Sequence, residues 1–244
     1  MTEAEWLACT DPGPMLEFFG GKASDRKLRL YLCAGCRHIS HLFFRPWSFT
    51  AVEVAERFAD GQATQEDLHR AEYDAEAATF GYELDDQHWP YSEPYRMEVV
   101  PRLVEIGALP KSALSGGEWR VDDATRQKLL GAAWLADCCA SFSVPSSKRW
   151  LSSISQVDWP GRWLLDCLFP NPFRPIALDP AWLTPQVKTL AQQIYNERAF
   201  ERMPELADAL AEAGSTNPDI LSHCRGPGPH VRGCWVVDLV LGKE

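Results

Sequence analysis

Helix start signals recur along almost the whole chain, and they constrain the fold more than any other feature of the sequence. At four places a side chain that caps helices stands directly before a proline: Asp11-Pro12, Asp179-Pro180, Thr184-Pro185 and Asn217-Pro218. A capping oxygen accepts an unpaired N–H of the first turn, and proline has no N–H to leave unpaired there. Thr2 with Glu5 and Thr64 with Asp67 have the spacing of capping boxes.

These starts predict an all-α fold, an irregular bundle of about ten helices with long connecting loops. Apolar/polar alternation with glycine-bearing hairpin turns is hard to find in the sequence. We expect helices near residues 3–9, 13–19, 25–44, 50–59, 65–79, 95–106, 122–142, 161–168, 185–199, 204–213 and 233–241. The segments 81–94 and 107–118 lack periodicity and contain turn formers, so we expect loops there.

Apolar stripes support the longer helices. In 25–44 the residues at three- and four-residue steps are Leu28, Leu32, Cys36, Ile39 and Phe43. In the carboxyl-terminal half, 186–200 and 204–213 show the same pattern. The final apolar run, 234–241, is too short to have a usable period and fits a buried helix or a strand; we predict a helix.

The length of 244 residues fits one helical domain or two packed lobes. In the two-lobe alternative, 1–80 forms an amino-terminal helical lobe, 81–160 an acidic insertion, and 161–244 a carboxyl-terminal helical lobe. The net charge of −10 arises mainly between residues 53 and 118, which hold fifteen Asp and Glu against five Lys and Arg. This acidic segment disfavours nucleic-acid binding, because phosphate contacts depend on Lys and Arg.

Sequence features also bear on the compartment. The first residues are acidic and lack the basic start and apolar run of a secretory signal, and no stretch is long and apolar enough for a membrane span. We therefore expect a cytoplasmic protein with no membrane association. In that compartment the eight Cys are expected to be thiols, metal ligands or a redox pair.

Several long phrases resemble a family of uncharacterised bacterial proteins: MTEAEWLACTDPGPMLEF, GKASDRKLRLYLCAGCRH, AVEVAERFADG and the stretch from NPFRPIALDPAWLTP to HCRGPGPHVRGCWVVDLVLGKE. The resemblance covers roughly residues 1–60 and 164–244, and it implies no activity, cofactor or catalytic residue. Similar proteins tend to have Cys-x-Cys-Cys-Arg-Arg where this chain has Cys33-Ala34-Gly35-Cys36-Arg37-His38. A metal site that needs a thiol at position 35 is therefore disfavoured.

Two segments contain residues able to form a site. Cys33 and Cys36 form a C-x2-C pair with His38 and His41 following, and sulfur and imidazole are ligands that zinc prefers. The pair lies inside a helical pattern, however, whereas zinc knuckles sit in loops. Core packing is the simpler interpretation, because buried Cys behaves as a small apolar side chain.

The second segment, His223 to Trp235, combines two Pro and three Gly with two Arg and two His. Such a stiff loop fits a carboxylate or phosphate held by an arginine fork, or a rigid turn that braces the carboxyl terminus. The candidate ligand-binding residues are Arg225, His230, Arg232 and Trp235.

The two segments together could also supply a zinc cluster. Candidate metal ligands are Cys33, Cys36, His223, Cys224, His230 and Cys234. A thiol enzyme would pair Cys224 or Cys234 with His223 or His230. His230 and Cys234 are four residues apart, which favours contact only within a helix, and Gly233 argues against a helix there.

No phosphate-binding loop, HExxH, GxSxG or EF-hand pattern is present in the sequence. We therefore predict a non-catalytic protein–protein interaction or adaptor module that presents exposed Trp or Phe and an acidic face to a protein partner, with no cofactor expected. The alternatives are a small-anion or zinc-binding protein, or a thiol enzyme, centred on residues 223–235.

Overall fold

The computed structural model describes all residues except 20–21, 81–92, 116–118, 142–153, 155–156 and 244. Its described residues form twelve α-helices and no strand, which confirms the all-α prediction. The α-helices are α1 (Glu3–Ala8), α2 (Pro12–Phe19), α3 (Asp25–His38), α4 (Pro46–Ala59), α5 (Gln65–Thr79), α6 (Glu93–Glu105), α7 (Asp123–Ala140), α9 (Arg162–Leu168), α10 (Pro185–Glu197), α11 (Met203–Glu212), α12 (Pro218–Arg225) and α13 (Trp235–Leu241). The 3-10 helices are η1 (Ser40–Leu42), η3 (Lys111–Ser115), η5 (Pro180–Trp182) and η6 (Phe200–Arg202).

The predicted start signals operate as expected. Both capping boxes, at Thr2 and at Thr64, are formed with reciprocal side-chain and backbone hydrogen bonds. α10 begins at Pro185 after the Thr184 cap, and α12 begins at Pro218, where the Asn217 side chain accepts from two backbone N–H groups. The signal at Asp179 starts a 3-10 helix instead of an α-helix.

Two helix boundaries differ by several residues from the prediction, and one helix was not predicted. The helix expected over 25–44 ends at His38, where the Ser40 hydroxyl donates to the carbonyl of Arg37, a local bond that competes with helix continuation. α4 begins four residues earlier than expected, at Pro46. Its start was not predicted because Arg45, the residue before it, is not a capping side chain and makes no cap hydrogen bond. α12 was missing from the expected helices although its start signal was recognised. The predicted loop 81–94 lies mostly outside the described residues, and η3 occupies part of the predicted loop 107–118.

The chain divides into two compact units. The first unit consists of residues 1–34 together with 160–244, and the second of residues 35–159. The boundary therefore falls inside α3, between Ala34 and Gly35. Each unit has a hydrophobic core of its own.

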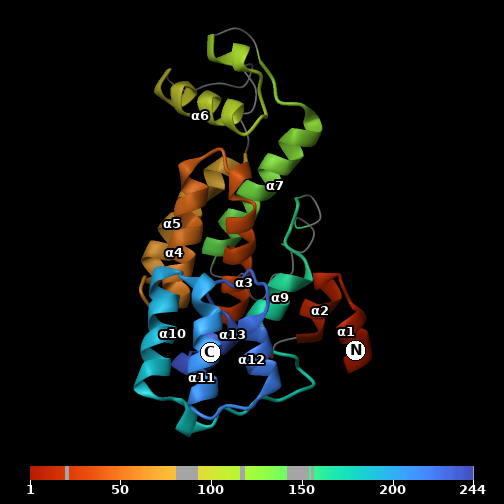
Figure 1. The fold of residues 1–244 in the computed structure, drawn as a ribbon. Coiled ribbons are helices and arrows are strands. Elements are labelled where there is room, and N and C mark those ends of the chain that lie inside the picture. The colour runs from red at the N-terminus through yellow and green to blue at the C-terminus, as the bar shows by residue number, and fades with distance from the viewer. Residues whose placement is uncertain (20–21, 81–92, 116–118, 142–153, 155–156, 244) are drawn as a thin grey trace. The chain divides into compact units, whose positions relative to one another are not determined.

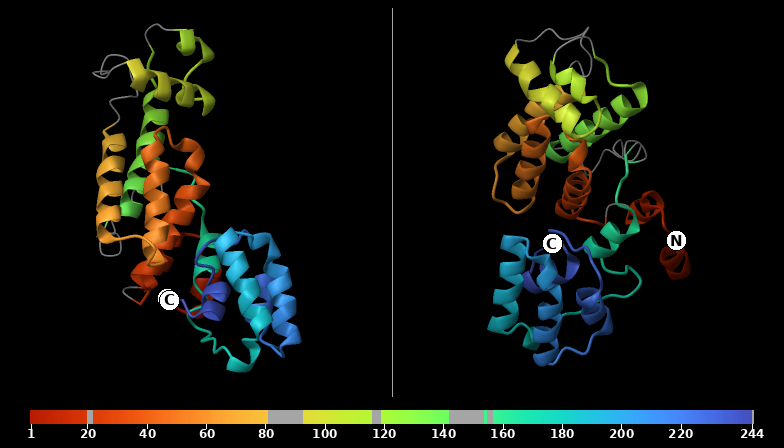
Figure 2. Two further views of the ribbon diagram at one scale, coloured as in Figure 1. Left: turned by 90° about the vertical axis from the view of Figure 1, so that its left-hand side faces the viewer. Right: turned by 45° about the horizontal axis from the view of Figure 1, so that its top comes forward.

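In the second unit α4, α5 and α7 lie side by side, as both views of Figure 2 show. α6 and η3 pack together at one end, where Val99, Leu103 and Trp119 join a buried cluster. At the start of this unit, a Cβ added to Gly35 would overlap the ring of Trp159. Packing in this chain therefore leaves no room for a thiol at position 35.

In the first unit α10, α11, α12 and α13 pack around one core (Figure 1). The predicted apolar face of α10 is buried at Val187, Ala191, Ile194 and Tyr195. The final apolar run forms α13, as predicted, and Trp235 at its first position is buried. Within the described residues, no helix has the length and apolar character needed to cross a membrane.

One buried carboxyl makes the stability of the second unit depend on pH. Asp137, in α7, is partly buried, and its Oδ1 has no hydrogen-bond partner among the described residues. Burial, with the neighbouring charges of Glu72 and Glu76 on α5, raises the pKa of Asp137 from 3.8 to about 7. In the unfolded chain this carboxyl ionises near its ordinary pKa, so stability falls as the pH rises from 4 to 7.

We predict that Asp137→Asn stabilises the protein at pH 8 by about 1–2 kcal/mol, after allowance for solvent screening of a partly exposed group. The advantage should shrink toward pH 4, where the carboxyl is protonated in the folded state and only about half ionised in the unfolded state. Urea unfolding of both proteins between pH 4 and pH 8 measures this difference. Asp74→Asn, which changes an exposed carboxylate of α5, is the control; a pH dependence equal to that control would contradict the assignment.

Candidate metal centre

Two Cys and two His of the first unit come together in one cluster. The ligand atoms of Cys167, His223, His230 and Cys234 all lie within 4.8 Å of one another. The Nε2 atom of His223 is 3.2 Å from the Sγ atom of Cys234. The Nδ1 atom of His230 is 3.9 Å from Sγ of Cys167 and 4.0 Å from Sγ of Cys234.

These separations suit tetrahedral coordination. With zinc–sulfur bonds near 2.3 Å and zinc–nitrogen bonds near 2.0 Å, the ligand atoms of a tetrahedral site lie about 3.3–3.8 Å apart. Three pairs in the cluster lie 3.2 to 4.0 Å apart, around this range, and all pairs lie within 4.8 Å. The cluster can therefore hold a metal ion with small side-chain movements.

Three parts of the chain supply the four ligands: α9, α12, and the loop between α12 and α13. Cys167 lies in α9 and His223 in α12, while Cys234 is the residue that precedes α13. His230 lies in the loop between α12 and α13. The rings of His223 and His230 are in edge contact, with centroids 4.8 Å apart.

The loop that carries His230 is fixed at its end by Gly233. This residue has φ +89°, in the left-handed region that favours glycine, and a Cβ here would lie 2.8 Å from side-chain carbons of both Leu30 and Leu168. Its carbonyl accepts from Lys27 Nζ at 2.6 Å. At the other side, the backbone N–H of Val231 donates to Sγ of Cys167 at 3.4 Å.

The two sulfur atoms are buried and electrostatically unequal. Cys167 is 3% exposed and Cys234 is 0% exposed. Burial alone raises the pKa of Cys234, but hydrogen bonds from Cys167, His223 and His230 outweigh it and bring this pKa well below its ordinary value. The hydrogen bond to Cys234, together with burial, raises the pKa of Cys167. Cys234 therefore gives up its proton more readily than Cys167, as a metal-binding thiol must.

A buried ion cluster supports α13 behind the metal ligands. Asp238 has a side chain 2% exposed and accepts from Arg26 Nη1 and Lys27 Nζ, each at 2.6 Å. Arg26 also donates to the hydroxyl of Tyr195 at 2.8 Å. Burial lowers the pKa of Lys27, against the opposing effect of Asp238. These contacts connect α3, α10 and α13 within the first unit.

Three of the predicted metal ligands, His223, His230 and Cys234, belong to the cluster. The other three do not. Cys33 and Cys36 are fully buried in α3, and Cys36 lies 3.5 Å from Sγ of Cys139. Cys224 is also buried, in an environment that raises its pKa through desolvation.

The predicted anion ligands do not form a common site in the structure. Arg225 pairs with Asp208 at 2.9 Å, and the Arg232 guanidinium lies 5.0 Å from the centre of the Tyr195 ring. Trp235 instead contacts a residue of the metal cluster: its indole N–H donates to Nδ1 of His223 at 3.2 Å. His230 and Cys234 are in contact without a helix between them, so the argument from helical spacing was wrong: the turn at Gly233 brings them together.

Cys167 was missed by the sequence reasoning. It lies in a short helix far from the other ligands in the sequence, and no spacing motif connects it to them. The sequence offered one weak indication: Cys167 was among the Cys to which no other hypothesis gave a role.

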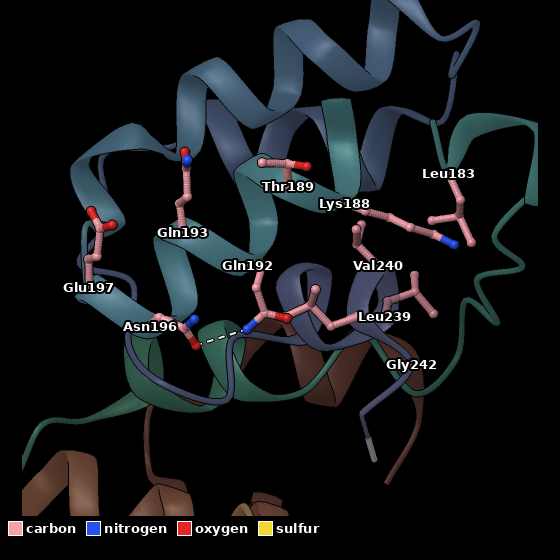
Figure 3. Close-up of a pocket in the computed structure, with 11 residues that line it drawn as sticks. Leu183, Lys188, Thr189, Gln192, Gln193, Asn196, Glu197, Leu239, Val240 and Gly242 are labelled. Atoms are coloured by element: carbon pink, nitrogen blue, oxygen red, sulfur yellow. Dashed lines mark hydrogen bonds between the residues drawn. The ribbon is translucent and has the colours of Figure 1, made fainter. Parts of the chain in front are cut away.

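A larger pocket lies away from this cluster. It has a volume of about 640 Å³ and lies between α10 and α13 (Figure 3). Its polar side chains include Gln192 and Asn196, which hydrogen-bond to each other at 2.8 Å. Its lining contains neither Cys nor His, so it offers no comparable metal chemistry.

Comparisons of the chain with protein-family models, with curated proteins and with solved structures found no match. The resemblance described from the sequence therefore stays a prediction.

We predict that Gly233→Ala destabilises the protein by about 2–4 kcal/mol, because it adds backbone strain at positive φ to overlap with Leu30 and Leu168. Gly242→Ala is the matched control: Gly242 has φ +66°, but a Cβ there meets nothing within 4 Å. Only the backbone strain of about 1–2 kcal/mol is expected in the control. Equal losses of unfolding free energy in the two variants, measured by urea unfolding, would show that overlap with Leu30 and Leu168 contributes nothing.

Proposed function

We propose that this chain is a zinc-binding protein in which the ion joins α9, α12, α13 and the loop before α13. The observation that carries the proposal is the convergence of four soft ligand atoms, two sulfur and two nitrogen, within 4.8 Å. Zinc is favoured over calcium or magnesium, because the latter prefer oxygen ligands.

The number of ligands supports a structural role for the ion. Structural zinc sites are bound by four protein ligands, whereas catalytic sites keep one position open for water or substrate. Here the full complement of ligands is available, and both sulfur atoms are buried. A dication bound to two thiolates also removes the cost of leaving negative charge in a buried environment.

The hydrogen bond from Trp235 to His223 provides a reporter for metal binding. Because the indole N–H donates to Nδ1, the proton of neutral His223 is on Nε2, which faces Cys234. If Nε2 held a metal ion, the neutral His223 ring would carry its proton on Nδ1, opposite the indole N–H that now donates there. The Trp235 ring would then have to move, so we expect its fluorescence to change when zinc binds.

The alternative functions receive less support. A thiol enzyme centred on Cys234 has a candidate base in His223, but its sulfur is 0% exposed and so cannot meet a substrate without rearrangement. The adaptor interpretation requires an exposed aromatic face. The exposed large apolar side chains include Phe49, Tyr73 and Phe80, but no described Trp. A role in binding a protein partner stays a prediction.

We predict that the purified protein binds one zinc ion per chain. Cys167→Ser should lower the zinc affinity by at least about 100-fold, because it removes a ligand contributed by α9. Competition with a chromophoric chelator measures the affinity. Cobalt substitution should give the visible absorption of a tetrahedral site with sulfur ligands.

Cys224→Ala is the matched control, since Cys224 is a buried neighbour of His223 outside the cluster. This variant should retain zinc, as should Cys36→Ser. Failure of the wild-type protein to take up zinc, or full retention of zinc by Cys167→Ser, would overturn the proposal.

A further inference from the structure

A second pocket of the first unit, about 310 Å³ in volume, shares a wall with the metal cluster. His223 and Trp235 line it, so one metal ligand and its hydrogen-bond donor face this space. α1, α9, α12 and the extended segment after α9 form the remaining walls. The volume is at the lower end of the range for small-molecule sites, which suits a ligand the size of an amino acid.

Two arginine–carboxylate pairs line this pocket. Arg162 Nε donates to Asp166 at 2.9 Å, and Arg174 Nη1 lies 3.7 Å from Asp219. Both pairs are partly exposed, and all four side chains belong to the pocket lining.

The two arginines are held in place by contacts that use only part of each guanidinium. Arg162 Nη1 donates to the carbonyls of Trp6, Leu7 and Cys9, at 2.6–2.9 Å. Arg174 Nε donates to Glu3 at 2.7 Å. In neither arginine does Nη2 hydrogen-bond to another described residue. Each guanidinium is thus oriented and still has donors for a ligand.

The carboxylates of Asp166 and Asp219 also use only part of their hydrogen-bonding capacity. Asp166 uses Oδ2 for Arg162, and Asp219 uses Oδ1 for Arg174. The remaining oxygen of each side chain makes no hydrogen bond or ion pair with the described residues. The pocket lining therefore has donors and acceptors of both charges.

This balance selects the class of ligand. A simple anion would be attracted by the two arginines but repelled by Asp166 and Asp219. A simple cation would be attracted by the two carboxylates but repelled by the arginines. A molecule with both charges can satisfy both sets. The rest of the wall has an apolar part, which includes Trp6, Phe169, Ile176 and Trp235, and a neutral polar part formed by Asn171, Ser222 and His223.

We propose that this pocket binds a small zwitterion with an apolar side chain, of the class of apolar α-amino acids. The carboxylate of the ligand pairs with Arg162 and Arg174, its ammonium group with Asp166 or Asp219, and its side chain packs on the aromatic wall. This site goes beyond zinc binding and does not depend on it.

The test uses the full chain and L-leucine as probe, with binding measured by calorimetry and by amide NMR shifts. N-acetyl-L-leucine lacks the ammonium charge and L-leucinamide lacks the carboxylate. We expect saturable binding of leucine and at least about 10-fold weaker binding of both analogues, because each leaves one set of charges unmatched. Equal binding of either analogue, or no saturable binding of leucine, would overturn the proposal.

Variants then locate the site. Asp219→Asn and Arg174→Gln should each weaken leucine binding by about 10-fold, the loss expected for one charged contact. Asp219→Asn is nearly isosteric and guards against loss of fold in the Arg174 variant. Arg225→Gln, in an exposed ion pair outside the pocket, is the matched control. Unchanged binding in both pocket variants would overturn the assignment. Repeating the titration with and without zinc separates this result from the zinc proposal.

Discussion

The buried carboxylate of Asp238 is the interaction on which the first unit most depends. It lies in α13 and accepts from two consecutive cations of α3, Arg26 and Lys27. Burying three charges is costly, and the cost is met only while all the partners are present. Lys27 also binds the carbonyl of Gly233, so one ammonium group fixes both α13 and the turn before it. Cys234 lies between these two anchored points, and its position follows from them.

A similar arrangement fixes the amino-terminal segment. The last turn of a helix has carbonyls without intrahelical partners. After α1 these carbonyls are taken by a single side chain, since Arg162 Nη1 binds the carbonyls of Trp6, Leu7 and Cys9. Arg162 belongs to α9, the helix that also provides Cys167. The amino-terminal segment, residues 1–34, thus belongs to the same unit as residues 160–244, although more than a hundred residues of the second unit lie between them in the sequence.

Local signals in the sequence predicted most of the fold. Capping at Thr2, Thr64 and Thr184 depends on residues within one turn, and the structure has these helices. The helix over 25–44 was overextended because its apolar pattern continues through Phe43 while the backbone does not. Contacts between distant segments leave no local sequence signal. The packing of residues 1–34 with residues 160–244 in one unit therefore could not be inferred from the sequence.

The candidate site shows the same limit. His223, His230 and Cys234 were recognised because they lie in one unusual segment. Cys33 and Cys36 were included because of their spacing, but α3 buries both as core residues. Cys167 was omitted because its role arises only when α9 packs beside the loop before α13. Composition and spacing identify residues capable of ligation, whereas three-dimensional packing decides which of them meet.

The position of Cys167 in the chain has a consequence for the order of folding. The segment from 168 to 222, which contains α10 and α11, forms the loop that must close before Cys167 can meet His223. Closing a flexible loop of this length costs on the order of 3–4 kcal/mol of chain entropy. An ion bound first to His223, His230 and Cys234 would gain its fourth ligand, Cys167, only after α10 and α11 had packed. If the chain binds zinc as proposed, full coordination would report that the carboxyl-terminal helices have assembled, and the bound ion would act as a cross-link that resists their separation.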